Sequence, residues 1–151
     1  NSYFGNLRSY QSLDGIKYLK SSFPTDYEAI LWINKNIKGQ PVILEAQGDS
    51  YTDFGGVSTN TGLPTVFGWT VHEWLWRGTY DTPAPRIPEI LKMYESQNLE
   101  ETKNLLKQYR VEYVFIGNLE RQKYPNLKEE KFQKLGKVIY QKGQANIYKT
   151  N

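Results

Sequence analysis

The sequence predicts an α/β fold, a small sandwich in which helices pack on a mixed, mostly parallel central sheet. Two short apolar runs, at 41–46 and 111–117, have the length and composition of buried strands. Helical periodicity occurs between and around them, and this alternation is typical of the α/β class. Near the C-terminus, two segments of alternating apolar and polar residues predict an antiparallel hairpin. The length of 151 residues fits one domain, 1–151, whose core needs no disulfide.

The two apolar runs, PVILEA and VEYVFIG, lack the alternation of a strand with one solvated face. We therefore expect both to be nearly fully buried and to be parallel neighbours at the centre of the sheet. Ligands of such sheets collect beyond the carboxyl ends of the strands. The residues that follow these two strands are therefore the first candidates for a site.

Capping signals predict where several helices begin. Thr25 and Glu28 form a capping box, and three isoleucines follow it on one helical face. Asn98 and Asn126 are expected to cap two later helices. The pair Gly143–Gln144 has the length and the glycine position of a type II′ turn between the last two strands.

From 47 to 85 the periodicity is lost, and glycine and proline recur. A loop this long within a compact domain is uncommon and is usually functional. Its segment 62–78 holds three of the four tryptophans and the only histidine. A short strand at 64–69 is the one regular element expected in this Gly/Pro/Trp-rich loop.

Charge is unevenly distributed along the chain. The net charge of +3 is too small to indicate a nucleic-acid partner. Residues 40–85 carry one basic and five acidic groups, whereas 86–151 carry thirteen basic and eight acidic groups. A polyanion would be repelled by the acidic third, but a sugar or a cation would not.

The sequence contains no cysteine and one histidine, which limits the metal sites it can form. A zinc site would need carboxylates for its remaining ligands, which is an unusual set. Calcium bound by Asp49, Asp53 or Glu73 is the better alternative, although no EF-hand spacing supports it. We therefore expect no metal ion and no cofactor, with calcium in the acidic loop as the open alternative.

Several ionisable and aromatic side chains of the loop have two interpretations each. His72 could act as an acid, a base or a ligand with Glu73 as its partner. Alternatively, it orders the loop through hydrogen bonds. Arg77 either pairs with a carboxylate, which is favoured, or grips an anion. Trp74 and Trp76 face the same way on an extended backbone, where they would stack on sugar rings or hold a partner. Alternatively, the tryptophans pack the loop onto the core.

Glu45 is the one charge in an apolar strand, where an unpaired charge is costly. We expect it to accept hydrogen bonds from the long loop, from Arg77 or His72. Trp69 is expected to be the apolar anchor of the loop, because Gly68 lets the backbone approach closely.

Glu120 and Arg121 follow the second strand and are expected to join the same cluster. No residue is expected to be catalytic. The candidate binding residues are Glu45, Asp49, Tyr51, Trp69, His72, Glu73, Trp74, Trp76, Arg77 and Arg121.

Three blocks of the sequence resemble one family over nearly the whole chain, 13–148. They read AILWINKNIKGQPVILEAQGDSY, VSTNTGLPTVFGWTVHEWLWRG and LLKQYRVEYVFIGNLERQKYP. The family is that of the YYY-domain proteins, large multi-pass membrane proteins of bacteria and archaea, and the resemblance is to their carboxyl-terminal soluble part. The family's motif has Gln where Leu75 stands here. The residues that match are Glu45, Gly48, Tyr51, Thr61, Gly62, Pro64, Gly68, Trp69, His72, Glu73, Trp76, Arg77, Glu120 and Arg121.

The resemblance implies a location and a partner. It implies that many membrane spans precede Asn1 in the native protein, and that this chain is its excised soluble domain at the extracytoplasmic side of the cell membrane. The family looks like integral-membrane glycosyltransferases that use lipid-linked sugars, with the catalytic carboxylate in the membrane part. The implied partners are the transmembrane portion of the same chain and a sugar or lipid-linked sugar.

The leading hypothesis is a non-catalytic extracytoplasmic domain of a glycosyltransferase-like membrane protein, which helps bind a sugar or lipid-linked sugar. A second hypothesis is a purely structural domain that packs on the membrane part. A third and weaker one is a freestanding carbohydrate-active hydrolase that uses Glu45 or Glu73 with His72.

Overall fold

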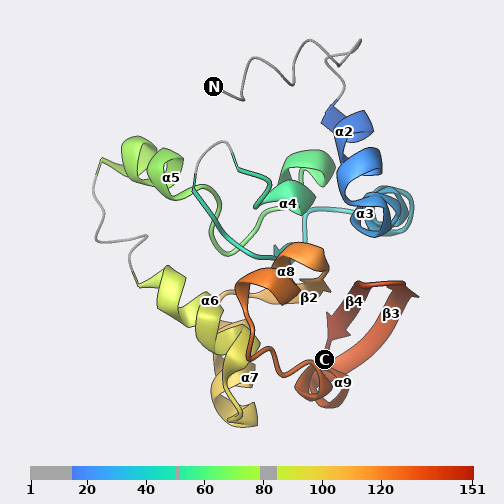
Figure 1. Ribbon diagram of the computed structural model, residues 1–151. Coiled ribbons are helices and arrows are strands. Elements are labelled where there is room, and N and C mark those ends of the chain that lie inside the picture. Colours follow the sequence, from blue (N-terminus) through green and yellow to red (C-terminus); the bar gives the residue numbers. More distant parts are fainter. Residues whose placement is uncertain (1–14, 50–51, 79–84) are drawn as a thin grey trace.

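The computed structural model describes residues 15–49, 52–78 and 85–151, which form an α/β fold around a mixed four-stranded sheet (Figure 1). The strands lie in the order β1-β2-β4-β3. This confirms the predicted fold class and the C-terminal hairpin of β3 and β4. Only β1 and β2 are parallel, so the prediction that parallel pairing predominates is wrong. The strand bounds are β1 Val42–Leu44, β2 Val111–Ile116, β3 Gly136–Lys142 and β4 Ala145–Thr150.

The predicted parallel pairing of the two apolar runs is confirmed, with Leu44 of β1 opposite Val114 of β2. Their predicted place at the centre holds for β2 only, since β1 is the last strand at its side of the sheet. That edge is nevertheless covered. The Ile43 amide donates to the Pro64 carbonyl at 2.9 Å, and Ile43 forms a bridge with Thr65. The long loop therefore shields β1, in which Ile43 and Leu44 are fully buried and Val42 is partly buried.

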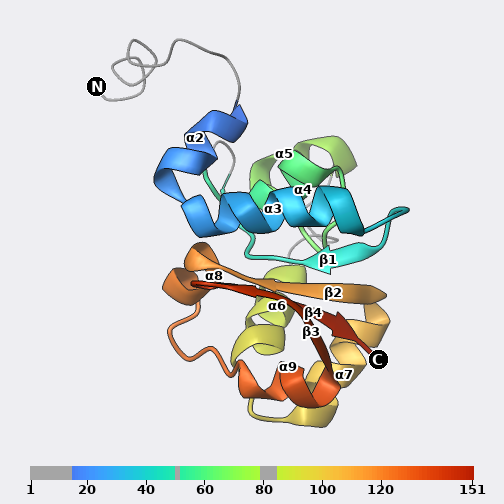
Figure 2. The same cartoon turned by 90° about the vertical axis from the view of Figure 1, so that its right-hand side faces the viewer.

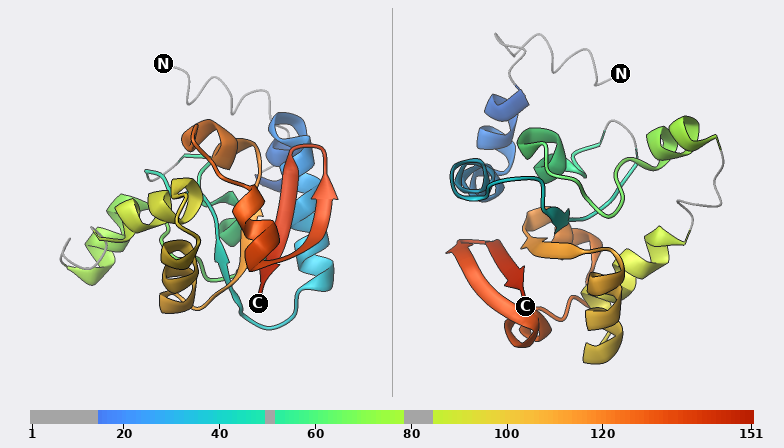
Figure 3. Two further views of the ribbon diagram at one scale, coloured as in Figure 1. Left: turned by 90° about the horizontal axis from the view of Figure 1, so that it is seen from below. Right: turned by 180° about the vertical axis from the view of Figure 1, so that it is seen from behind.

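Helices cover both faces of the sheet (Figure 2). Helices α2, α3 and α4 lie on one side, and α6, α7 and α9 lie on the other. Helix α8 follows β2 at its carboxyl end, and α5 lies at the end of the molecule away from the β3–β4 hairpin (Figure 3). The helix bounds are α2 Gly15–Ser22, α3 Pro24–Asn36, α4 Gly56–Thr61, α5 Thr70–Arg77, α6 Arg86–Glu95, α7 Leu99–Gln108, α8 Asn118–Lys123 and α9 Glu130–Leu135. None of the helices in the described ranges is long and apolar enough to cross a membrane.

The sheet divides the hydrophobic core into two clusters. Successive side chains of a strand point to opposite faces. In β2, Val114 and Ile116 therefore pack with Tyr94 of α6, whereas Phe115 packs with Ile30 and other residues of the α3 side. Burial on both faces explains why this strand is a nearly continuous apolar run.

The predicted capping box at the start of α3 is wrong. The helix begins at Pro24, a residue suited to the first turn, and no side chain caps it. Thr25 lies inside the first turn, where its hydroxyl accepts from the Asn118 side chain at 3.1 Å. Glu28 pairs instead with Lys142 of the hairpin at 2.7 Å. Both side chains of the apparent capping box thus bind residues of other elements and do not cap the helix.

Of the two predicted asparagine caps, Asn98 is confirmed and Asn126 is wrong. The Asn98 side chain accepts from the Glu100 and Glu101 amides, each at 3.1 Å. Helix α9 begins only at Glu130, four residues beyond Asn126. The two-residue hairpin turn is confirmed, since Lys142 pairs with Ala145 around Gly143, which has a φ of 57°.

The long loop contains two short helices that its sequence did not predict, α4 and α5. Helix α4 has the sequence GVSTNT, which offers no apolar periodicity. Left-handed glycines, Gly55 and Gly62, bound it at φ 75° and 73°. The strand expected at 64–69 is reduced to isolated bridges, of which one joins Gly48 to Trp69.

Candidate functional site

The segments that follow β1 and β2 leave the sheet at the same edge, because the two strands are parallel. Two carboxylates there are almost fully buried, with Glu45 2% and Glu120 3% exposed. Buried charges require partners. The partners of these two acids show how the long loop is held on the sheet.

Glu45 binds the beginning of helix α4. Its Oε2 accepts from the Val57 amide at 2.8 Å, and its Oε1 accepts from the Ser58 amide at 2.9 Å. The prediction that Glu45 accepts from the loop is confirmed, and the donors are backbone amides in place of the predicted His72 side chain. The other predicted donor, the Arg77 side chain, lies outside the described part of the chain. The physical reason is that the first amides of a helix lack partners within it and attract a negative charge. Burial raises the pKa of Glu45, and the hydrogen bonds from Ser58 and Val57 oppose this rise.

Glu120 joins the end of β1 to the beginning of α8. It accepts from the Ala46 amide at 2.8 Å and from the Gly117 amide at 2.9 Å. Burial raises the pKa of Glu120 to about 7 against the effect of these hydrogen bonds, and nearby Glu45 raises it further. The expectation that Glu120 belongs to the cluster is therefore confirmed.

Asp26 of α3 is a third buried acid at this edge, and it accepts from the Asn118 amide at 3.3 Å. Burial raises the pKa of Asp26, and hydrogen bonds from Asn118 and Thr25 lower it. Asp26, Glu45 and Glu120 line one cavity of about 20 Å³. This is the size of a water molecule's site and far too small for a sugar. The buried acids therefore hold the fold and do not form an active site for a saccharide.

Arg121 pairs with Glu129 and does not join Glu45. Its Nη1 lies 2.8 Å from the Glu129 carboxylate, and its Nε donates to the Gln144 carbonyl at 3.2 Å. Tyr148 also donates to Glu129, at 2.7 Å. Burial would raise the pKa of Glu129, but the hydrogen bonds from Arg121, Asn146 and Tyr148 lower it. These contacts tie α8 to the C-terminal hairpin.

Trp69 holds the long loop from within. Its Nε1 donates to the Phe54 carbonyl at 2.7 Å, and its ring is half-buried. Gly55 lies against this ring, since a Cβ at Gly55 would be 3.5 Å from the Trp69 Nε1, and Gly68 lines the adjacent groove. Trp69 thus makes the anchoring contact that the sequence predicts, but through a polar hydrogen bond as well as its apolar ring.

A groove of about 200 Å³ opens beside Trp69, and we call it the aromatic groove. The rings of Trp69 and His72 lie 5.2 Å apart, and the rings of His72 and Trp76 are stacked at 6.4 Å. Trp76 is 89% exposed. The groove is lined by Gly55, Ser58, Thr59, Gly68, Trp69, His72 and Trp76.

Helix α5 brings His72 and Trp76 together because residues four apart share one helical face. The prediction that Trp74 and Trp76 face the same way assumed an extended backbone, whereas residues Thr70–Arg77 are helical. The side chains of Glu73, Trp74 and Arg77, and the whole of Tyr51, lie outside the part of the chain that the structure describes. Their predicted roles therefore stay predictions.

A second cavity, of about 400 Å³, lies nearby and is lined by Gln47, Asp49 and Lys123 among others. Lys123 donates to the Gln47 carbonyl and lies 4.6 Å from the centre of the Phe54 ring. Burial lowers the pKa of Lys123, whereas Asp49 and Glu120 raise it. The sequence did not single out Lys123. Its only signal was its position six residues after the end of the second predicted strand.

Within the described ranges, no three side chains of the metal-binding types come together as a possible metal site. Asp49 is exposed beside the Lys123 cavity. The site thus offers aromatic rings, a histidine and hydroxyl groups at the aromatic groove, and one lysine at the neighbouring cavity.

No family model and no curated protein sequence matches this chain. Among solved structures, the chain is similar to the C-terminal globular domain of an oligosaccharyltransferase from Archaeoglobus fulgidus. The two are 12% identical, the match covers 84% of this chain and 97% of that chain, and the TM-score is 0.54. At this identity the similarity shows that the two chains share a fold.

Proposed function

We propose that this chain is a non-catalytic domain of a glycosyltransferase-like membrane protein and that it helps hold a sugar or a lipid-linked sugar. Two observations of different kinds support the proposal. The fold is shared with a domain of an oligosaccharyltransferase over 84% of the chain. Independently, the residues of the loop resemble the soluble part of the YYY-domain membrane proteins. The partner of the domain is then the transmembrane portion of its own chain, on the extracytoplasmic side of the cell membrane.

The aromatic groove is the observation that carries the sugar-binding part of the proposal. The Trp76 ring is 89% exposed and is backed by His72, so it offers a flat apolar face to a ligand. Sugar rings present C–H faces to such aromatic surfaces and hydroxyls to polar neighbours. Ser58 and Thr59 supply hydroxyl groups at the rim of the groove. An uncharged saccharide also suits the acidic third of the chain.

The buried acids favour binding over hydrolysis. Two-carboxylate glycosidases need a pair of acids that flank the bond to be broken. Here Glu45 and Glu120 are each occupied by two backbone amides and face a cavity of about 20 Å³. We therefore place the chemistry in the membrane part of the protein.

The binding proposal is tested by titrating the 151-residue chain with mono- and disaccharides while recording amide chemical shifts. We expect shifts at Trp69, His72 and Trp76, and at least tenfold weaker binding in Trp76→Ala, because one stacking face is lost. Leu75→Ala is the matched control, since Leu75 is the exposed neighbour on α5 and does not line the groove. If no saccharide changes the amide chemical shifts of the groove residues, the proposal is contradicted.

The non-catalytic part has its own test. The chain alone should turn over no glycoside or lipid-linked sugar, because the buried acids Glu45 and Glu120 face a cavity of about 20 Å³, which is too small for a sugar. The measurement is product release by chromatography over a panel of donors and glycosides. Turnover that disappears in Glu73→Gln would show instead that the chain is an enzyme.

A purely structural role on the membrane part is the second candidate, and one observation favours it. Helix α5 exposes Val71 by 41% and Leu75 by 63%, next to Trp76. Apolar side chains gathered on one short helix suit a protein or membrane contact. The two roles differ in outcome, because only the sugar-binding role makes Trp76→Ala weaken binding by the chain alone.

A further inference from the structure

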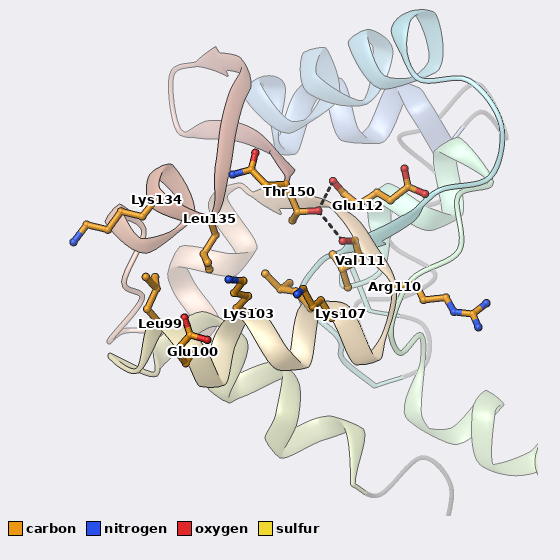
Figure 4. A pocket seen from close by; sticks show the side chains of 12 residues that line it. Leu99, Glu100, Lys103, Lys107, Arg110, Val111, Glu112, Lys134, Leu135 and Thr150 are labelled. Carbon is orange, nitrogen blue, oxygen red and sulfur yellow. Dashed lines mark hydrogen bonds between the residues drawn. The ribbon is translucent and has the colours of Figure 1, made fainter.

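A larger groove lies at the opposite end of the sheet, where β2 begins and β4 ends (Figure 4). Its volume is about 520 Å³, and we call it the basic groove. Leu106 of α7, Val111 at the start of β2 and Leu135 at the end of α9 give it an apolar floor. The volume lies within the range of small-molecule pockets, roughly 300–1,000 Å³.

Two lysines of α7, Lys103 and Lys107, stand side by side over this floor (Figure 4). They are four residues apart, so they occupy one helical face at a spacing at which like charges repel. Neither forms an ion pair with any residue in the described ranges. An anion held between the two ammonium groups would relieve this repulsion.

The two ends of the groove also carry cations. Arg110 lies at one end, and Lys134 lies at the other (Figure 4). Arg110 has a left-handed backbone with a φ of 53°, a conformation that favours glycine, and it turns the chain from α7 into β2. Glu100 and Glu112 also line the groove, so four basic side chains outnumber two acidic side chains. The groove is therefore apolar below and cationic above.

We propose that the basic groove binds a single-chain amphiphilic anion. Its carboxylate or phosphate group would lie between Lys103 and Lys107, and its hydrocarbon chain would cover the apolar floor. A small amphiphile is favoured over an acidic peptide because the outer strand β3 contributes no edge to the lining, so no strand addition is available to a peptide. This site is distinct from the aromatic groove and does not depend on the proposed function.

The test uses the 151-residue chain and decyl phosphate below its micelle concentration. We expect saturable methyl chemical-shift changes at Leu106, Val111 and Leu135. The double variant Lys103→Ala/Lys107→Ala should bind at least tenfold more weakly, since two charge-assisted contacts are lost. A second double variant, Lys35→Ala/Lys38→Ala, removes the same charge from exposed positions at and after the end of α3 and should bind like the parent.

Three parallel titrations can overturn the proposal. Equal binding of decanol would show an apolar site without anion recognition, and equal binding of inorganic phosphate would show an ion site without a chain. Displacement of decyl phosphate by a peptide of alternating Glu and Leu, at lower concentration, would assign the groove to a protein partner. Unchanged affinity in Lys103→Ala/Lys107→Ala would also contradict it.

Discussion

At the scale of single residues, buried carboxylates hold the long loop and the helix starts by accepting hydrogen bonds from backbone amides. Glu45 fastens α4, and Glu120 fastens the end of β1 to α8. Both acids accept from backbone amides at a helix start or beyond a strand end. The cost of this arrangement is the burial of negative charge, which raises the pKa of both groups.

This cost predicts how stability depends on pH. The pKa of Glu120 is about 7 in the folded chain and near its ordinary value of 4.5 when unfolded. The folded state therefore prefers the protonated acid. Its contribution to the free energy of unfolding is fully present below pH 4.5 and is lost as the pH rises through 7. The loss is on the order of 3 kcal/mol.

Glu120→Gln should remove this part of the pH dependence, because glutamine stays neutral. Between pH 4.5 and 8, urea unfolding should show a smaller fall in the free energy of unfolding for Glu120→Gln than for the parent. Some fall remains, since burial also raises the pKa of Asp26 and Glu45. The exposed Glu112→Gln serves as the control. Parallel curves for Glu120→Gln and the parent would contradict the assigned cause.

At the scale of elements, the long loop keeps its shape through contacts with side chains, because few backbone ladders support it. In the described part of the loop, the two bridges, at Thr65 and Trp69, are isolated. Glu45 binds the start of α4, and the Trp69 indole binds the Phe54 carbonyl at 2.7 Å. Helix α5 then presents Trp76 at the rim of the aromatic groove.

Trp69→Phe tests the polar part of this support, because it keeps an aromatic ring and removes the indole donor. The Phe54 carbonyl would lose its partner, so we expect a loss of about 1–3 kcal/mol in the free energy of unfolding. Hydrogen exchange should speed up most at the α4 amides of Val57 and Ser58. Trp32→Phe, at a tryptophan on α3 with no indole hydrogen bond in the described part, is the control. Exchange that rises equally across the sheet would argue against a local role.

At the scale of the whole molecule, the sequence predicted correctly that helices pack on a sheet. It predicted the order of the strands within the sheet less well. Apolar runs such as 111–116 require burial on both faces, and this alone predicts a strand between helices. The edge position of β1 was not predictable in the same way. It depends on Pro64 and Thr65 covering that edge, a contact between segments twenty residues apart.

The sequence predicted the role of Glu45 in the candidate site but missed helix α5 and Lys123, because both depend on contacts that local sequence patterns do not show. Eight residues, TVHEWLWR, contain too few turns for helical periodicity to stand out, so the sequence was interpreted as extended where the backbone is helical. Lys123 is one of nineteen basic residues, and only the fold brings it to Gln47 and Phe54. Glu45 was predictable, because a single charge within an apolar strand needs a partner wherever the chain runs.

The most direct test of the central claim is sugar transfer by the full-length protein in membranes. The rate is measured against the concentration of a lipid-linked sugar for the parent, Trp76→Ala and Leu75→Ala. If the aromatic groove holds the saccharide, Trp76→Ala should raise KM at least fivefold and leave kcat nearly unchanged, because binding is lost without loss of the chemistry. Leu75→Ala should behave like the parent. Equal KM values for all three proteins would contradict the claim that this domain helps hold the sugar.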